Sequence, residues 1–340
     1  MKYIKRLLVI GVSICIANLA CYGYYNPTHG SIKNTYRLEP NDRGFQAMEG
    51  IALTETDSNG FTNKDFPVEK DCILVMGSSQ GSGQNVLIEE RFSDQLNYML
   101  GYEESYKVYN VCYSGGLFKD IVHNYQQLLD EFPGTNRVFI ELDSGHLIMT
   151  HDDLAYALDQ VGIEESVTGT LLSDYSVKDK FVFYIKEALP LALLGVKQYY
   201  AWKPLMTNIS FEKKVGEKDI LLSDVDCQKV EIEYWEECIR LISEQSEAEV
   251  TIVFHDPIDM NVNENTDTSL PDKMKQIEKI CNKYNIDVIN MIPVFSQNYL
   301  ENYEVPYGFH NTQFNKGHLN KVGNRLIAEE MYKYIMEKEK

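Results

Sequence analysis

The chain has 340 residues, with 32 basic and 51 acidic side chains and a formal net charge of −19. Nucleic-acid backbones are bound by clustered lysines and arginines, so this balance argues against nucleic acid as a partner. The apolar content is sufficient for a substantial core, in one large domain or two modest ones.

The first 25 residues differ from the rest of the chain. Lys2, Lys5 and Arg6 precede a nearly uncharged run, LLVIGVSICIANLACYGYY. Its length is that of a signal-peptide core or of a membrane-spanning helix, and the positive-inside rule places everything after it outside the cytoplasm. We expect residues 1–25 to form an uncleaved, single-pass anchor with an extracytoplasmic domain. Cleavage, which would give a secreted protein, and lipidation of Cys21 are the alternatives.

The seven cysteines do not suggest a disulfide scaffold or a zinc site, because they are scattered and show no C-x-x-C spacing. Cys72 and Cys112 lie in apolar runs and are expected in the core. A disulfide between Cys227 and Cys238 is an open alternative.

Residues 26–70 are polar and read as an extended segment, with a turn expected at Asn59-Gly60 in TETDSNGFTN. The pattern then becomes regular. Apolar runs predict strands at 72–77, 106–112, 137–142, 249–255 and 286–291, and helical periodicity lies at 86–100, 117–132, 228–246, 272–284 and 319–337.

Short apolar strands that alternate with helices predict an α/β domain with a parallel sheet covered on both faces, and sites at the carboxyl ends of the strands. One stretch interrupts the alternation, from 146 to 227. It is too long for an ordinary connection, and we expect a helical cap inserted in the domain.

The loop after the first predicted strand, GSSQGSG at 77–83, is glycine-rich. Its spacing fits some dinucleotide-binding loops, and Tyr199 and Lys203 have the Y-x-x-x-K spacing of short-chain dehydrogenases. Pro204 follows Lys203 and disfavours a helical turn there. A Walker loop is excluded because no Lys-Ser or Lys-Thr follows the glycines.

The alternative is that the loop carries a nucleophile. A serine in a tight turn between a strand and a helix gains backbone N–H donors and the favourable end of the helix dipole. Such a serine needs a base, and His318 stands immediately before the amphipathic terminal segment.

Three motifs together resemble the SGNH (GDSL-like) hydrolase superfamily: ILVMGSSQGSG, VYNVCYSGG and GHLNKVGNRLIAEEM, in the order that family uses. The stretch TDSNGF also resembles exported members linked to bacterial surface polysaccharides. The resemblance implies a three-layer α/β/α sandwich with a five-stranded parallel sheet over residues 71–340.

Carried over by position, the resemblance implies that Ser79 is the nucleophile, with Ser78 where the family usually has Asp. It implies that His318 is the base, and that the N–H groups of Ser79 and Gly115 hold the oxyanion. No cofactor and no metal are implied.

Two positions depart from the family pattern. Gly145, in ELDSGHL, stands where the oxyanion Asn is usual, and Asp143, Ser144 or His146 could compensate. Asn315 replaces the Asp that usually orients the histidine; an Asn can still orient an imidazole, as in Cys-His-Asn proteases.

Two acidic stretches raise metal binding as an alternative. His255, Asp256 and Asp259 in HDPID are more simply a turn at the end of a strand. His151 with the acids that follow it fits a solvated helix start.

The sequence therefore predicts an extracytoplasmic esterase or O-acyltransferase that acts on ester groups, acetyl above all, of a cell-surface polysaccharide. Its partners would be the acylated glycan and a membrane acyltransferase or polysaccharide-export protein. The altered positions Gly145 and Asn315 keep open a weakly active or inactive relative that serves as a scaffold or binding protein in such a complex.

Overall fold

The computed structural model describes residues 2–22, 40–41, 43–46, 49–50, 52–64, 71–101, 107–113, 118–147, 176–178, 189, 191, 195, 199, 224–245, 247–263 and 265–340. Most of the insertion predicted at 146–227 lies outside these ranges, and so do Gly115, His151, Lys203 and the side chain of Cys227. The predicted cap and the Cys227–Cys238 disulfide are therefore not described.

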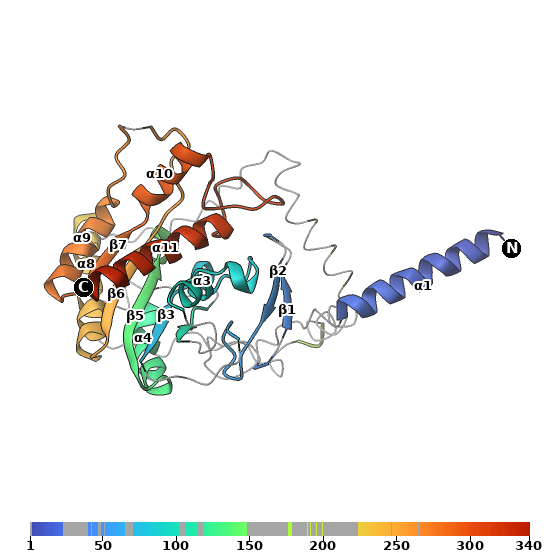
Figure 1. Cartoon of the computed structure of the whole chain (residues 1–340), viewed down its shortest axis with the longest axis horizontal. Helices are drawn as coiled ribbons and strands as arrows, with labels where there is room; N and C mark the ends of the chain where they lie inside the picture. The colour runs from blue at the N-terminus through green and yellow to red at the C-terminus, as the bar shows by residue number, and fades with distance from the viewer. Residues whose placement is uncertain are drawn as a thin grey trace.

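The centre of the fold is a five-stranded sheet whose order is β4-β3-β5-β6-β7, with every neighbouring pair parallel (Figure 1). Numbered along the chain, this is the 2-1-3-4-5 order of flavodoxin-like folds. The predicted α/β class with a five-stranded parallel sheet is confirmed. The strands are β3 (Cys72–Met76), β4 (Val108–Asn110), β5 (Thr135–Leu142), β6 (Glu249–Phe254) and β7 (Asp287–Asn290).

The two faces of the sheet carry separate apolar clusters, because successive strand residues point to opposite sides. Leu74 and Met76 pack in one cluster, and Ile73 and Val75 in the other. The first cluster includes residues of α4 (Phe118–Glu131), α8 (Asp224–Gln245) and α9 (Asp272–Lys283). The second includes residues of α3 (Phe92–Met99), α10 (Ile292–Asn302) and α11 (Lys321–Lys338).

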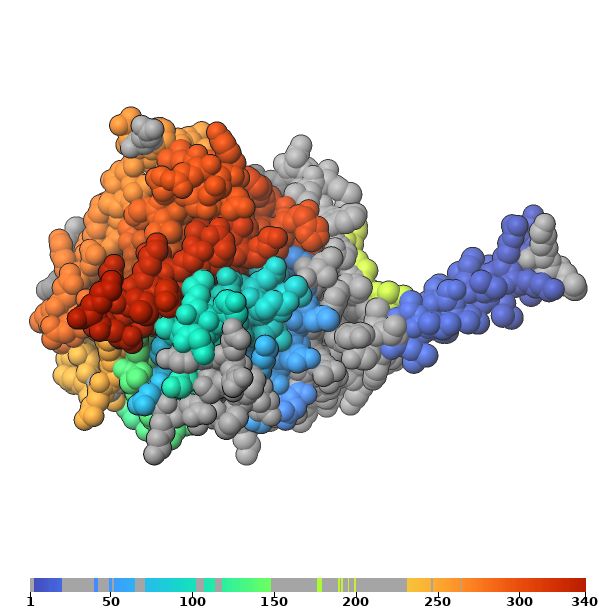
Figure 2. Space-filling view, in the orientation of Figure 1, coloured from blue at the N-terminus to red at the C-terminus, as the bar shows by residue number. Residues whose placement is uncertain are grey.

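Helices α3 and α11 contact each other, and in Figure 2 they lie side by side on the near face, in cyan and dark red. The helix predicted at 86–100 is divided into η1 (Ile88–Glu90) and α3. Arg91 separates them in an extended conformation, because its buried guanidinium donates to the carbonyl of Thr62 and pairs with Asp94 at 2.9 Å.

Helix α1 (Lys2–Tyr22) lies within the N-terminal segment 1–25 that was predicted separately. The segment predicted as extended, 26–70, contains β1 (Arg43–Gln46), which pairs with β2 (Ala52–Glu55) in an antiparallel sheet. Within the described ranges, no helix has the combined length and apolarity needed to cross a membrane.

The predicted turn at Asn59-Gly60 is confirmed, with Gly60 at φ +83°. Asp57 organises it, since its Oδ1 accepts the N–H of Asn59 at 2.8 Å and of Phe61 at 3.0 Å. The turn docks on the end of β4, where Asn63 exchanges two hydrogen bonds with the backbone of Asn110.

Candidate active site

Ser79 lies at the carboxyl end of β3, as the first residue of the short helix α2 (Ser79–Ser82). Ser78 caps this helix, its hydroxyl accepting the N–H of Gln80 at 3.1 Å. Gly83 ends the helix in the left-handed region at φ +60°. The loop is therefore the strand–turn–helix that the nucleophile hypothesis predicted.

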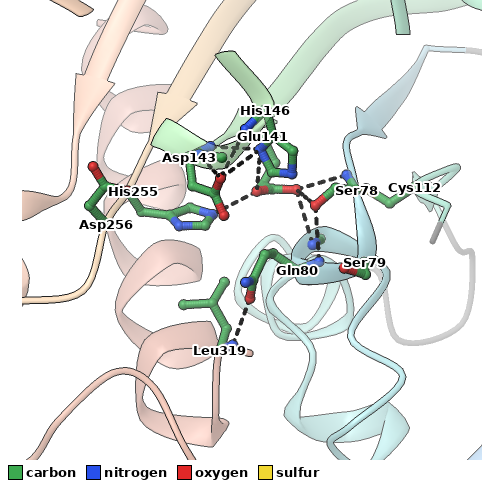
Figure 3. A network of polar contacts seen from close by, with 12 residues as sticks. Ser78, Ser79, Gln80, Cys112, Glu141, Asp143, His146, His255, Asp256 and Leu319 are labelled. Atoms are coloured by element: carbon green, nitrogen blue, oxygen red, sulfur yellow. Dashed lines mark hydrogen bonds and ion pairs between the residues drawn. The ribbon is translucent and has the colours of Figure 1, made fainter. Parts of the chain in front are cut away.

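The N–H groups of this turn surround a buried carboxylate (Figure 3). Oε2 of Glu141, at the end of β5, accepts the N–H of Ser78 at 2.9 Å and of Gly81 at 3.1 Å. A Cβ at Gly77 would lie 2.5 Å from that oxygen, and one at Gly81 would lie 2.9 Å away. The glycines thus make room for an internal carboxylate. The donors that would receive a phosphate in a dinucleotide site are already bound to it.

His318 faces Ser79 from the loop between α10 and α11. Its Nε2 lies 2.9 Å from the Oγ of Ser79, within hydrogen-bond distance. Gln80 holds the backbone on both sides of His318: its Nε2 donates to the carbonyl of Gly317 at 3.2 Å, and its Oε1 accepts the N–H of Leu319 at 2.7 Å. The residue after the candidate nucleophile therefore fixes the candidate base.

The other ring nitrogen of His318 faces Glu49. Oε2 of Glu49 lies 2.8 Å from Nδ1 and also accepts the backbone N–H of His318 at 2.8 Å. Burial raises the pKa of Glu49, but hydrogen bonds from His318 and its charge outweigh this, so the pKa lies below its usual value. Ser79, His318 and Glu49 form the chain of contacts that defines a nucleophile–base–acid triad. The side chains of His318 and Glu49 are 30% and 27% exposed, so the group is open to solvent.

The backbone around Glu49 is hydrogen-bonded to the loop 303–320 that carries His318, here called the histidine loop. Gly50 donates its N–H to Oδ1 of Asn311 at 2.8 Å and accepts from Nδ2 of the same side chain at 3.4 Å. Gly317, at φ +83°, lets the carboxylate approach closely, because a Cβ there would lie 2.6 Å from Oε2 of Glu49.

Asn315 does not make the contact predicted for it. Its Nδ2 donates to the carbonyl of Ile258 at 2.7 Å, and its side chain is buried. The residue stands at φ +54°, a conformation that Asn tolerates better than most residues. It thus joins the histidine loop to the segment after β6, while Glu49 contacts His318.

The sequence carried no local signal for Glu49. It lies outside the motifs and stands 269 positions from His318. The only indication was the missing carboxylate near His318, which any acid in the chain could supply.

One of the two predicted oxyanion donors, the backbone N–H of Ser79, lies among the described residues. The backbone N–H of Ser79 has no hydrogen-bond partner among the described residues, whereas the N–H groups of Ser78, Gln80, Gly81 and Ser82 are all bonded. It is therefore available to a ligand at the start of α2. Gly115, the second predicted donor, lies outside the described residues.

The residues that could replace the missing oxyanion Asn are engaged elsewhere. Gly145 donates its N–H to Oδ1 of Asp143 at 2.7 Å, and Ser144 donates its hydroxyl to Asp256 at 2.5 Å. Nδ1 of His146 accepts the N–H of Asp143 at 2.7 Å. In Figure 3, Asp143 and His146 group with Glu141 and His255.

These groups also bear on metal binding. Glu141, Asp143 and His146 offer ligand atoms within 4.8 Å of one another. However, the lone pair of His146 Nδ1 accepts a backbone N–H, and Oε1 of Glu141 pairs with Nε2 of His255 at 2.8 Å. In the HDPID stretch, Asp256 accepts from Ser144 and Asp259 from the N–H of Asn261, as expected of a turn.

Comparison with solved structures finds proteins that are similar to this chain only at low sequence identity and low TM-score. An acetyl xylan esterase is 13% identical in sequence and has a TM-score of 0.38. The match covers 77% of this chain and 99% of the esterase chain. A two-domain esterase active on acetylated mannans is 11% identical and has a TM-score of 0.41. The match covers 80% of this chain and 50% of that esterase. A member of the lipolytic G-D-S-L family from Veillonella parvula is 14% identical and has a TM-score of 0.35. The match covers 77% of this chain and 96% of that protein.

No family model matches the chain, and no curated protein matches it. Similarities of this size assign no activity, so the function is argued from the contacts of Ser79, His318 and Glu49.

Proposed function

We propose that the chain is a serine esterase or O-acyltransferase of the SGNH type, with Ser79 as nucleophile, His318 as base and Glu49 as the acid that orients the base. The observation that carries this is the unbroken Oγ–Nε2 and Nδ1–Oε2 contact chain, at 2.9 and 2.8 Å. It lies at the carboxyl edge of a parallel sheet, where α/β proteins place their sites.

In the first half-reaction, the Oγ of Ser79 attacks the ester carbonyl carbon while Nε2 of His318 takes the hydroxyl proton. Glu49 accepts the Nδ1–H bond, which fixes the tautomer and stabilises the imidazolium. The N–H of Ser79 would donate to the oxyanion, together with that of Gly115 as the family resemblance implies. The tetrahedral intermediate collapses, the C–O bond breaks, and the leaving alkoxide takes the proton from His318.

The second half-reaction releases the acyl group from Ser79. His318 removes a proton from water, which gives hydrolysis, or from a sugar hydroxyl, which gives transfer. The oxygen so activated attacks the acyl carbonyl carbon, the bond from that carbon to Oγ breaks, and Oγ takes the proton back from His318, which restores the serine hydroxyl. The triad serves both outcomes, and the accessibility of water against acceptor decides between them.

We assign the substrate as O-acetyl groups on a cell-surface polysaccharide, and the location as outside the cytoplasm on an N-terminal anchor. The basic residues before the apolar run at the N-terminus support export. The TDSNGF resemblance supports the polysaccharide. A membrane acyltransferase or polysaccharide-export protein would then be the partner.

The test is p-nitrophenyl acetate hydrolysis by residues 26–340, beside Ser79→Ala, His318→Ala and Glu49→Gln. We expect turnover in the wild type, near-complete loss in the first two variants and a large loss in the third. Wild-type activity that survives Ser79→Ala would refute the assignment.

A scaffold or binding role is the second candidate. Gly145, where a side-chain oxyanion donor is usual, favours it. A wild type that neither hydrolyses esters nor transfers acetyl groups, yet binds an acetylated polysaccharide, would establish that role.

A further inference from the structure

Glu141 is a charged side chain that the proposed reaction does not use. It is 1% exposed, and its Oε2 receives the N–H groups of Ser78 and Gly81, with the hydroxyl of Ser78 at 3.3 Å. A buried carboxylate in contact with three donors of one turn is rigidly held. Ser79 lies between the two residues whose N–H groups bind this oxygen, so the position of the carboxylate sets that of the serine.

The same carboxylate leads to the loop that carries His318. Its Oε1 pairs with Nε2 of His255 at 2.8 Å, and Nδ1 of that imidazole lies 2.5 Å from the hydroxyl of Tyr307. All three side chains are at most 1% exposed. Tyr307 forms a β-bridge with Leu319, and the N–H of the next residue, Gly308, donates to the carbonyl of His318.

We propose that Glu141, His255 and Tyr307 are positioning residues that set the Oγ–Nε2 geometry of Ser79 and His318. This inference rests on the proposed function. The three side chains connect the turn that carries Ser79 to the loop that carries His318, beneath the site (Figure 3 shows the part from Ser78 to His255). None of them touches the substrate. Their effect appears in the alignment of the two reacting groups.

The ionised form of Glu141 suits this role. Burial raises its pKa, but the neighbouring imidazoles of His146 and His255, the hydrogen bond from His255 and the N–H of Ser78 outweigh burial and lower the pKa to about 2. The negative charge therefore persists at every pH at which an ester would be turned over. Glu141→Gln keeps the shape and one acceptor, but it removes the charge and sets an NH2 group against His255.

The experiment compares Glu141→Gln and Tyr307→Phe with a matched control, Tyr334→Phe. Tyr334 lies at the opposite end of the sheet, where its hydroxyl is 3.0 Å from Glu249 and 2.6 Å from Asp287, at the starts of β6 and β7. Each Tyr→Phe change removes one hydrogen-bonded hydroxyl. The measurements are kcat and KM for p-nitrophenyl acetate per site labelled by a fluorophosphonate, and the melting temperature.

We expect Glu141→Gln to lower kcat by about tenfold or more, Tyr307→Phe to lower it several-fold, and KM to stay within about twofold in both, because misplacement of reacting groups acts on the chemical step. Tyr334→Phe should lower the melting temperature and leave kcat unchanged. Retained kcat in both site variants, or a kcat loss in all three that follows the melting temperature, overturns the proposal. If Glu141→Gln does not fold, Tyr307→Phe decides it alone.

An inactive wild type would be a failure of the proposed function, and a second readout keeps the two separate. The 15N resonances of the His318 ring, identified by their loss in His318→Ala, report its hydrogen bonds without turnover. Shifted resonances in Tyr307→Phe but not in Tyr334→Phe support the positioning network. Unchanged resonances refute it.

Discussion

Glu49 and His318 are 269 positions apart in sequence, yet one carboxylate oxygen of Glu49 lies 2.8 Å from both the Nδ1 and the backbone nitrogen of His318. The double contact orients the imidazole and fixes its main chain together. The acid of this site thus comes from the segment before the main sheet.

Glu49→Gln tests that relationship. The amide keeps the size of the side chain but has no charge to stabilise the imidazolium, and it can present its NH2 group to Nδ1. We expect kcat for p-nitrophenyl acetate to fall by up to about 10⁴-fold, the loss found when the acid of a Ser-His-Asp triad is replaced by its amide. Glu55→Gln, exposed in β2 of the same segment, is the control and should retain activity. Equal rates in both variants would remove Glu49 from the triad.

Gln80→Ala removes the two hydrogen bonds that hold the backbone on either side of His318. The serine and the base remain, but the base loses its fixed position. A fall of about tenfold in kcat is expected, with little change in melting temperature because Gln80 is half-buried. Gln126→Ala, on the exposed side of α4, is the comparison. A kcat within twofold of the wild type would show that the histidine loop needs no such support.

Asn315→Asp introduces the residue that the SGNH resemblance would place at this position, and the structure predicts that the change destabilises the protein. The substitution removes the donor to Ile258 and places a carboxylate against that buried carbonyl. We expect a loss of about 1–3 kcal/mol in the free energy of unfolding, measured in urea, and no gain in activity. Asn265→Asp, at an exposed position, should be nearly neutral. Increased activity in Asn315→Asp would mean that the aspartate reaches His318.

Low pH should reduce the free energy of unfolding, because Glu141 must then take up a proton. Its folded pKa of about 2 lies below the ordinary carboxyl value of 4.5, so the stabilisation is complete above pH 4.5 and is lost as the pH falls toward 2. Glu49, whose pKa is also lowered, acts in the same direction. We expect the unfolding free energy of the wild type to decline below about pH 4.5, and Glu141→Gln to decline less steeply. The exposed Glu89→Gln is the control. Parallel curves for all three proteins would contradict this account.

The sheet could be predicted because β3, β5 and β6 each contain a run of consecutive buried apolar residues. Every residue of β3 is buried, which is the pattern of a strand covered on both faces, and β3 begins where its apolar run begins. Helix α10 was missed. Its proline, Pro293, stands in the first turn, where the missing N–H costs nothing, and the flanking sequence has no strong apolar stripe.

For the site, the pattern of elements pointed to the serines of the loop after the first strand and to His318 before the last helix, and the family resemblance selected Ser79 among those serines. Glu49 and Glu141 were not, for two different reasons. Glu49 lies in a polar stretch, and its contact is purely tertiary. Glu141 lies within a strand whose pattern predicts burial, and only the structure shows the N–H groups that compensate a charge there.

The fastening of Gly50 to Asn311 has a consequence for a nicked chain. If the backbone were cut between residues 64 and 71, Glu49 would belong to a separate peptide, held by Asn311, by His318 and by the contacts of Asn63 with Asn110. The effective concentration that the covalent link provides would be lost. Activity would then depend on protein concentration and return when the released peptide is added back, as in a two-fragment enzyme.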